Sequence, residues 1–549
     1  MPSDPTDPRF DWDTATTLEA FLAAIVPLTA EERGLIIAQA KILLGEYYVH
    51  LPFKLQTHVI DPLGDLDRLS AALPDPADDV GFHRKMCAIF AGLRDLHTQY
   101  SLPGTYQKSA AILPFKLGAC VQNGKPCYLV TEMLEGWTVP TADRGFGVGA
   151  EIVAWDGVAM DEAVARLATL SGGASSATRR ARALASMTLS PMDRQPPPAP
   201  ARITLAFRGV GERAEFELAL DWRVIDVGLE RTDPALAHIV ALDQEGELRR
   251  RASAHVYHPK VIDAERHAAA GGRHKPYLDT PTLPTTLPSV FKAQPIEGTE
   301  YGYIRIFTFN PPGPANPFTA LLQQFIGEFV HLIGELPQQG LVVDVRGNGG
   351  GYMPLAEALL QTMTDTPISP QLLELRATPS VLALARASGD LHGFVPSLEQ
   401  AIRSGSGYSK GQPLTNPAWC NGLGRQYPGP VVLIMDARCY SSTDAFVAGF
   451  QDHGIGKVIG VAPTTGAGGA NMWTLPDLMT AQPDTPLQSL PQGASLRAAL
   501  RRSRRVARNS GMLVEEFGVT ADIQHSVTRS DLLYEDRDLL ALAVRTLHS

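Results

Sequence analysis

The chain has 549 residues, of which 44% are hydrophobic and 19% charged, and its formal net charge is −10. This composition excludes a disordered or fibrous protein, and the length predicts roughly three domains. The acidic balance argues against a nucleic-acid partner, because phosphate binding normally requires a basic surface.

The first residues, MPSDPTDPRFDW, are acidic and rich in proline, whereas a signal peptide begins with basic residues followed by an apolar run. No apolar run reaches the length that crosses a membrane. We therefore expect a cytoplasmic protein with no membrane partner. The five cysteines form neither a CxxC pair nor a cluster with histidine, which predicts reduced thiols and no metal site.

Residues 1–108 are predicted to form a helical domain. The segment TAEERGLIIAQAKILLGEYYVH opens with Thr29 and Glu32, the pattern of a capping box, and carries apolar residues at helical spacing. A second run, VGFHRKMCAIFAGLRDLH, places apolar residues on one helical face and ends near His97.

Residues 109–228 are predicted to form a small β-rich module, because short apolar runs such as KPCYLVTEML and ARITLAFRG alternate with turns. Residues 229–296 mix the run HIVALD with charged and Pro/Thr-rich segments. We expect extra strands and a linker in this region.

Residues 297–549 alternate apolar strands with helical runs, as in YGYIRIFTF, PFTALLQQFIGEFVHLIGEL, LVVDVRGNGGG and PVVLIMDARCYSSTDAFVAGF. This order predicts an α/β domain with a largely parallel sheet that helices cover on both faces, so the whole chain is expected to be an α/β multidomain protein. The basic tract RAALRRSRRVAR, residues 497–508, is predicted to be a solvated face and not a nucleic-acid site.

Consecutive glycines, Gly349–Gly351, follow one of the predicted strands. They allow a sharp turn that brings backbone N–H groups close to an anion. A phosphate-binding P-loop would require Lys and then Ser or Thr, but Tyr352 and Met353 follow the glycines. The turn is therefore a candidate oxyanion site, and a strand-to-helix turn without a ligand is the alternative.

A serine run, Ser441 and Ser442, lies between an apolar strand and an amphipathic helix. A serine in this position presents its hydroxyl at the sheet edge beside helix N-terminal amides, which suits both attack on a carbonyl and stabilisation of the anion that forms. Such residues also serve as N-caps, so the run alone leaves both interpretations open. Nothing around Cys439 favours a reactive thiolate.

Together, DVRGNGGG, the serine run with its acidic residue, and KVIGVAPTTGAGG resemble the core of the C-terminal-processing, tail-specific and tricorn-type serine peptidases. The resemblance extends to YGYIRIFTF, EEFGVTADIQHS and LRDLHTQY, and it covers most of residues 85–160 and 300–545. It implies a crotonase/Clp-like sheet-and-helix core. It also implies a serine peptidase that acts on peptides or unfolded protein tails without a metal or an organic cofactor.

The resemblance also implies roles for individual residues. Family members carry the nucleophile three residues before an acidic residue, which gives Ser441 before Asp444, with Ser442 as the competitor. The tail-specific branch takes a general-base lysine from a Gly-Lys-Gly element, but Ala467 stands at that position and cannot accept a proton. The tricorn-like branch uses a histidine in a Leu-x-x-x-His-Thr context, and LRDLHT implies His97 as the base.

A third group is expected to orient the imidazole of His97. Similarity to the family's Glu-x-x-Gly-Val-x-x-Asp segment points to Glu515, while Asp95 and Thr98 are the alternatives. Of the three, Glu515 is the residue that the resemblance implies.

The oxyanion is expected to be held by the N–H of Gly350 or Gly351 together with that of Ser442. In the β-rich module, residues 147–157 resemble the PDZ element with its G-x-x-I-x-x-x-x-G pattern, which implies a PDZ-like module that adds an extended peptide as a strand. Plain scaffolding is the alternative role of this module.

Two other functions stay open beside a peptidase: a non-catalytic binding protein on the same fold, and a hydrolase of esters. The expected partners are peptide or protein substrates. The sequence leaves open the oligomeric state, a homo-oligomer included, and the cleavage specificity.

Overall fold

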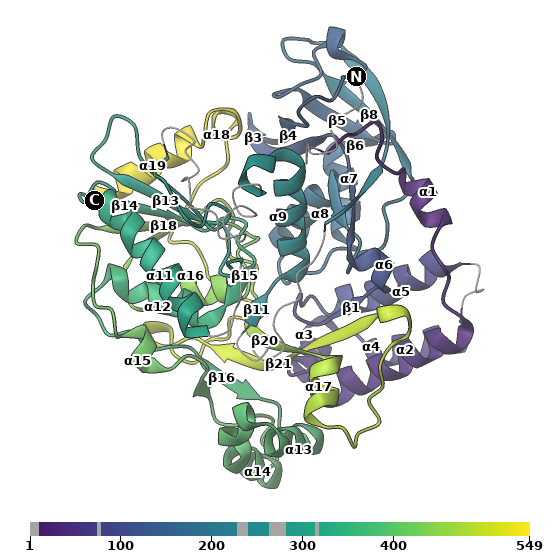
Figure 1. Cartoon of the computed structure of the whole chain (residues 1–549), viewed down its shortest axis with the longest axis vertical. Coiled ribbons are helices and arrows are strands. Elements are labelled where there is room, and N and C mark those ends of the chain that lie inside the picture. Colours follow the sequence, from purple (N-terminus) through teal and green to yellow (C-terminus); the bar gives the residue numbers. More distant parts are fainter. Residues whose placement is uncertain (1–9, 74–77, 228–239, 263–281, 313–317, 549) are drawn as a thin grey trace.

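The computed structural model describes residues 10–73, 78–227, 240–262, 282–312 and 318–548. It is a mixed α/β protein with several separate sheets, which confirms the predicted class (Figure 1). Among the described helices, none combines the length and the apolar character that a membrane span requires.

The N-terminal part is helical. The capping box is present, since the Thr29 hydroxyl accepts a hydrogen bond from the Glu32 N–H and the Glu32 carboxylate accepts one from the Thr29 N–H. The second predicted helix ends at Gly92, so that His97 lies in the loop that follows it. The helices here are α1 (Leu18–Ala23), α2 (Ala30–Ile42), the π-helical turn η1 (Leu43–Tyr47), α3 (Leu51–His58), α4 (Pro62–Ala71), α5 (Asp79–Gly92) and α6 (Gly104–Gln107).

The central part is rich in antiparallel strands, as predicted. One sheet has the order β3-β4-β5-β8-β9 with β6 on β5, and a smaller sheet has the order β10-β2-β7. Whether this module is PDZ-like stays a prediction. Its elements are β2 (Ser109–Ile112), β3 (Phe115–Gln122), β4 (Lys125–Met133), η2 (Ala142–Arg144), β5 (Glu151–Trp155), β6 (Val158–Ala159), α7 (Met160–Ala168), α8 (Ser176–Ser186), β7 (Leu189–Pro191), β8 (Arg202–Arg208), β9 (Glu215–Asp221) and β10 (Arg223–Asp226).

The described part of the region predicted as extra strands and a linker contains two strands, β11 (Val240–Leu242) and β12 (Phe291–Pro295), and a helix that the sequence reasoning missed, α9 (Gln244–Tyr257). The Asp243 carboxylate caps this helix by accepting a hydrogen bond from the Gly246 N–H. Residues 229–239 and 263–281 of the predicted region lie outside the described residues.

The C-terminal part is built on a six-stranded sheet of order β12-β13-β14-β18-β19-β22, in which every neighbouring pair is parallel except β12 with β13. Helices α11, α12 and α16 pack on one face, and α19 packs on the other, as predicted (Figure 1). The sheet and its helices are β12 (Phe291–Pro295), β13 (Gly302–Ile306), α11 (Phe318–Glu335), β14 (Leu341–Asp344), α12 (Met353–Leu360), η4 (Gln361–Met363), β18 (Val431–Met435), α16 (Ser442–Asp452), β19 (Gly456–Gly460), β22 (Ile523–Gln524), α18 (Arg529–Leu533) and α19 (Arg537–Leu547).

A further sheet joins the two ends of the chain, because its strand β1 comes from the N-terminal part and the other strands come from the C-terminal part. Strand β21 pairs with β1, β16 and β20, and β17 pairs with β16. The elements in and around this sheet are β1 (Gln99–Ser101), β16 (Leu372–Leu375), α13 (Pro379–Ala387), η5 (Gly389–Phe394), α14 (Val395–Ser404), β17 (Gln412–Pro413), α15 (Pro417–Cys420), β20 (Ala470–Thr474), α17 (Leu475–Ala481), η6 (Pro491–Gly493), β21 (Ser495–Arg504) and η7 (Ala507–Asn509). A two-stranded ladder of β11 with β15 (Gly350–Tyr352) completes the strands.

The prediction that residues 497–508 form a solvated face is wrong. Most of this tract is the central strand β21, and Arg497, Arg501 and Arg502 are buried. Arg497 donates to the Leu96 carbonyl and to the Gln99 amide oxygen, both at 2.6 Å, so its guanidinium is held against this loop inside the protein. The tract thereby fixes the loop that precedes β1.

Candidate active site

Ser441 lies at the turn between β18 and α16, as the N-cap of the helix. Its backbone has φ 66° and ψ −119°, a conformation that is rare for a residue with a side chain. Backbone strain of this kind is found preferentially at functional sites. Only 3% of the residue is exposed, so its hydroxyl faces neighbouring protein groups.

The buried carboxylate of Asp444 holds this turn in place. It accepts hydrogen bonds from the N–H of Ser441 at 2.8 Å, from the N–H of Gly468 at 2.7 Å and from the hydroxyl of Thr465. Burial raises the pKa of Asp444 to about 6, although these hydrogen bonds favour the carboxylate. A Cβ on Gly468 would lie 2.6 Å from the Ser441 nitrogen, which explains why glycine occupies this position.

His97 contacts the Ser441 side chain from the N-terminal part of the chain. The His97 Nε2 lies 2.6 Å from the Ser441 Oγ, and the ring packs against Tyr440 at a centroid distance of 4.8 Å. Burial lowers the pKa of His97 to about 4, against the opposing effect of Asp95. A neutral imidazole therefore lies within hydrogen-bond reach of the hydroxyl, the arrangement that proton abstraction from serine requires.

The carboxylate nearest to the other ring nitrogen is that of Asp95. Its Oδ1 lies 3.8 Å from the His97 Nδ1 and accepts a hydrogen bond from the His97 N–H at 2.8 Å, while its Oδ2 accepts one from the Thr98 hydroxyl at 2.9 Å. Burial favours the neutral acid, but the imidazoles of His50 and His97 hold the pKa of Asp95 below its usual range. Asp95 is thus an anion beside the candidate base.

Glu515, predicted to orient the imidazole, is directed elsewhere in this structure. Its carboxylate lies 2.7 Å from the Lys54 ammonium and 3.9 Å from the His50 ring. It belongs to a buried cluster with His50 and Asp95, whose side-chain ligand atoms all lie within 4.8 Å of one another. The Lys54 ammonium is the cation that this cluster already contains, and burial raises the pKa of Glu515 to about 8 although Lys54 opposes this effect.

We expect Lys54→Met to lower the free energy of unfolding by about 3–5 kcal/mol, because it leaves the buried Glu515 carboxylate without its ion pair. The Lys54 side chain is fully buried and also lies 2.7 Å from Glu516. Urea denaturation of the two proteins at pH 7 measures the difference.

The matched control is Lys41→Met, which removes an exposed ion pair with Asp67. This change is expected to cost less than about 1 kcal/mol. Equal losses for the two substitutions would contradict the importance of the buried pair.

Two groups that compete with Ser441 as nucleophile are hydrogen-bonded elsewhere. The Ser442 hydroxyl donates to the Gly351 carbonyl at 2.8 Å. The Cys439 thiol donates to the Val345 carbonyl at 3.1 Å, and burial raises the pKa of this thiol well above its usual value. Attack on a carbonyl requires a serine hydroxyl whose proton is directed at a base, or a cysteine thiolate, and neither side chain meets this requirement.

The glycine turn lies next to the serine turn, since Tyr440 donates its N–H to the Asn348 carbonyl at 3.1 Å. The Gly350 N–H, predicted as an oxyanion donor, instead donates to the Asn348 amide oxygen at 2.9 Å. Gly351 lies opposite Ala241 in the β11–β15 ladder, so its main chain takes part in strand pairing. The Gly350 N–H is thus hydrogen-bonded within the turn, Gly351 lies in a strand ladder, and the Ser442 amide lies at the first residue of α16.

Residues 300–524 match the model of peptidase family S41. This segment is a family S41 peptidase domain. A domain of this family supports a serine-type peptidase activity and implies peptide or protein substrates. No curated protein sequence matches the chain.

Solved structures resemble this S41 peptidase over most of its length. The structure of mature CPAF matches with a TM-score of 0.64 at 14% identity, covering 94% of this chain and 97% of that one. Mature CPAF complexed with lactacystin matches with a TM-score of 0.61 at 15% identity, covering 94% and 98%. At such identities the likeness concerns the fold.

The tricorn protease matches with a TM-score of 0.36 at 14% identity, covering 95% of this chain and 37% of that one. A similarity at this level carries no argument about mechanism. The tricorn-like branch therefore stays a prediction that rests on the sequence around His97.

Proposed function

We propose that the S41 peptidase cleaves peptide bonds through an acyl-enzyme, with Ser441 as the nucleophile and His97 as its general base. The observation that carries this proposal is the 2.6 Å contact between the His97 Nε2 and the Ser441 Oγ, made by residues 344 positions apart in the chain. The low pKa of the buried imidazole supports it, because the neutral ring predominates at physiological pH.

In the proposed reaction, the Ser441 Oγ attacks the substrate carbonyl while its proton passes to the His97 Nε2. The carbonyl oxygen becomes an oxyanion, which the Ser442 amide at the N-terminus of α16 would stabilise. The imidazolium then gives its proton to the leaving amine. In the second half of the reaction, water attacks the acyl-enzyme ester while His97 takes a proton from it, and the imidazolium returns that proton to the Ser441 Oγ. Asp95, 3.8 Å from the Nδ1, would stabilise the imidazolium by its charge.

A fluorophosphonate probe tests the nucleophile directly, since it forms a covalent bond only with an activated serine. We expect labelling of the native protein, with the adduct located at residue 441 by mass spectrometry, and no labelling of Ser441→Ala. An adduct at Ser442 would overturn the assignment. A folded native protein that takes no label would favour the non-catalytic binding protein.

A further inference from the structure

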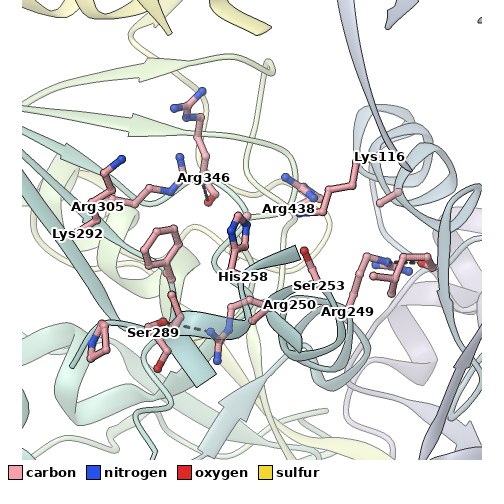
Figure 2. A pocket seen from close by; sticks show the side chains of 18 of the residues that line it. Lys116, Arg249, Arg250, Ser253, His258, Ser289, Lys292, Arg305, Arg346 and Arg438 are labelled. Atoms are coloured by element: carbon pink, nitrogen blue, oxygen red, sulfur yellow. Dashed lines mark hydrogen bonds between the residues drawn. The ribbon is translucent and has the colours of Figure 1, made fainter. Parts of the chain in front are cut away.

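A cavity of about 580 Å³ lies beside the candidate active site, between the β-rich module, α9 and the C-terminal sheet. Figure 2 shows its labelled side chains converging from these elements: Lys116 from β3, Arg250 and His258 from α9 and the residue after it, Lys292 and Arg305 from the C-terminal sheet. This volume lies within the range of binding sites for small ligands and short peptide segments.

The lining of the cavity is strongly cationic. Eight of its side chains belong to Lys or Arg, and Asp243 is the one carboxylate among the lining residues that the structure describes. The whole protein, by contrast, carries a net charge of −10. A concentration of positive charge on an acidic protein requires an explanation other than overall composition.

Several of these cations form ion pairs with buried carboxylates. Arg182 pairs with Asp243 and Glu245, and Arg305 and Arg346 share the buried Asp344. These ion pairs hold the lining side chains in place and reduce the positive charge that they present to a ligand.

The remaining cations are neutralised by carboxylates to different extents. Lys292 forms no ion pair with any residue in the described parts of the chain. Arg438 lies 3.3 Å from Asp436, and 42% of its side chain is exposed. Lys116 pairs with Glu132 and lies over the Tyr257 ring at 4.2 Å.

The cavity borders the elements that form the candidate active site. Gly347, which begins the glycine turn, is a lining residue, and a Cβ on it would lie 3.2 Å from the Arg438 guanidinium. Asp243 donates its N–H to the Gly349 carbonyl at 2.8 Å. Arg438 precedes Ser441 by three residues, so the segment that leads into the serine turn forms part of the cavity wall, although Ser441 itself is not a lining residue.

We propose that this cavity binds an acidic segment of the peptide substrate, so that the peptidase selects chains with Asp or Glu residues near the cleaved bond. Arg guanidinium groups match carboxylates in geometry, and clusters of them recognise acidic motifs. The lining also contains apolar side chains, including Leu117, Leu189 and Phe291, and β3 is an edge strand of its sheet. This mixture suits a peptide better than an inorganic anion. The inference rests on the proposed function.

The test measures binding with Ser441→Ala, which removes the proposed nucleophile but leaves the cavity. A fluorescent octapeptide rich in Asp and Glu is compared by anisotropy with the same peptide carrying Asn and Gln instead. We expect the acidic peptide to bind at least about tenfold more tightly, and this preference to weaken as salt increases.

The variant that tests the site is Lys292→Gln with Arg438→Gln, added to Ser441→Ala. It is expected to reduce the preference for the acidic peptide about tenfold. The matched control, Lys457→Gln, removes an exposed strand lysine of the same sheet that does not line the cavity, and it should leave the preference unchanged.

Equal binding of the two peptides would overturn the proposal, as would an unchanged preference in the double variant. Tight binding of tripolyphosphate without binding of the acidic peptide would also overturn it, because the cavity would then be a site for small polyanions. The proposed function has a separate test, because it is contradicted when the native protein takes no fluorophosphonate label. The binding experiment uses Ser441→Ala and does not depend on that outcome.

Discussion

Ser441→Ala is expected to lower kcat/KM for a peptide substrate by about 10⁴-fold or more, because it removes the covalent step while leaving the binding groups in place. The Ser441 N–H, which donates to Asp444, is kept in the variant, so the strand-to-helix turn should persist. Initial rates with a fluorogenic peptide measure the loss, and circular dichroism and thermal unfolding check that the fold remains.

Ser442→Ala is the matched control for this experiment. It removes the hydrogen bond to the Gly351 carbonyl, which is expected to cost about 1 kcal/mol of stability. Its activity should stay within about tenfold of the native protein, since the backbone amide proposed to hold the oxyanion is kept. A loss in Ser442→Ala as large as in Ser441→Ala would contradict the assignment of the nucleophile.

The kcat/KM of the native peptidase is expected to remain on its plateau at pH 6 and to fall as the pH drops through about 4. Only the neutral imidazole accepts the serine proton, and burial lowers the pKa of His97 to about 4, so the active form is lost below that pH and not near 6.5. Activity between pH 3.5 and 8 gives the profile, and a return to pH 7 after each measurement separates titration from irreversible unfolding. A midpoint near 6.5 would contradict a buried neutral base.

His97→Gln is expected to lower kcat/KM about 10⁴-fold and to abolish the acid limb of the pH profile. The control is His331→Gln, an exposed histidine on α11, which should keep both the activity and the limb. An acid limb that persists in His97→Gln would assign the titration to another group, such as Asp444, whose pKa is about 6.

Local patterns in the sequence predict much of the fold. The capping box at Thr29 starts α2 where expected, and the apolar runs of the C-terminal part become the parallel strands β13, β14, β18 and β19. These signals depend on neighbours a few residues apart, which the sequence displays directly.

The elements that sequence reasoning missed are stabilised by distant partners. Helix α9 has a mostly polar sequence with a narrow apolar stripe of Leu248, Ala252 and Val256. The charged side chains beside this stripe are paired within the helix, Arg249 with Glu245 and Arg250 with Glu247. In β21, the buried guanidinium of Arg501 bonds to the Asn471 side chain. Among the local signals, Asp243 as an N-cap and the apolar run Ala498–Leu500 inside the basic tract favoured the structures that form.

Residues of the candidate site could be predicted from the sequence only where they match a family motif. Ser441 and His97, chosen from such patterns, lie in contact. The third group could not be chosen in this way, because Asp95 and Glu515 both lie in one buried cluster, and only the positions of Lys54 and His50 decide which carboxylate approaches the ring. The donor positions at Gly350 and Gly351 likewise depend on hydrogen bonds with Asn348 and β11.

The sheet that joins the two ends of the chain determines when a newly made molecule can become active. Strand β1, directly after His97, pairs with β21, which begins at Ser495. During synthesis the ribosome must therefore make the residues up to β21 before the imidazole can be held against the hydroxyl. A nascent chain carrying only the first 440 residues lacks both the proposed nucleophile and the strand that anchors the proposed base, so it cannot carry out the proposed cleavage.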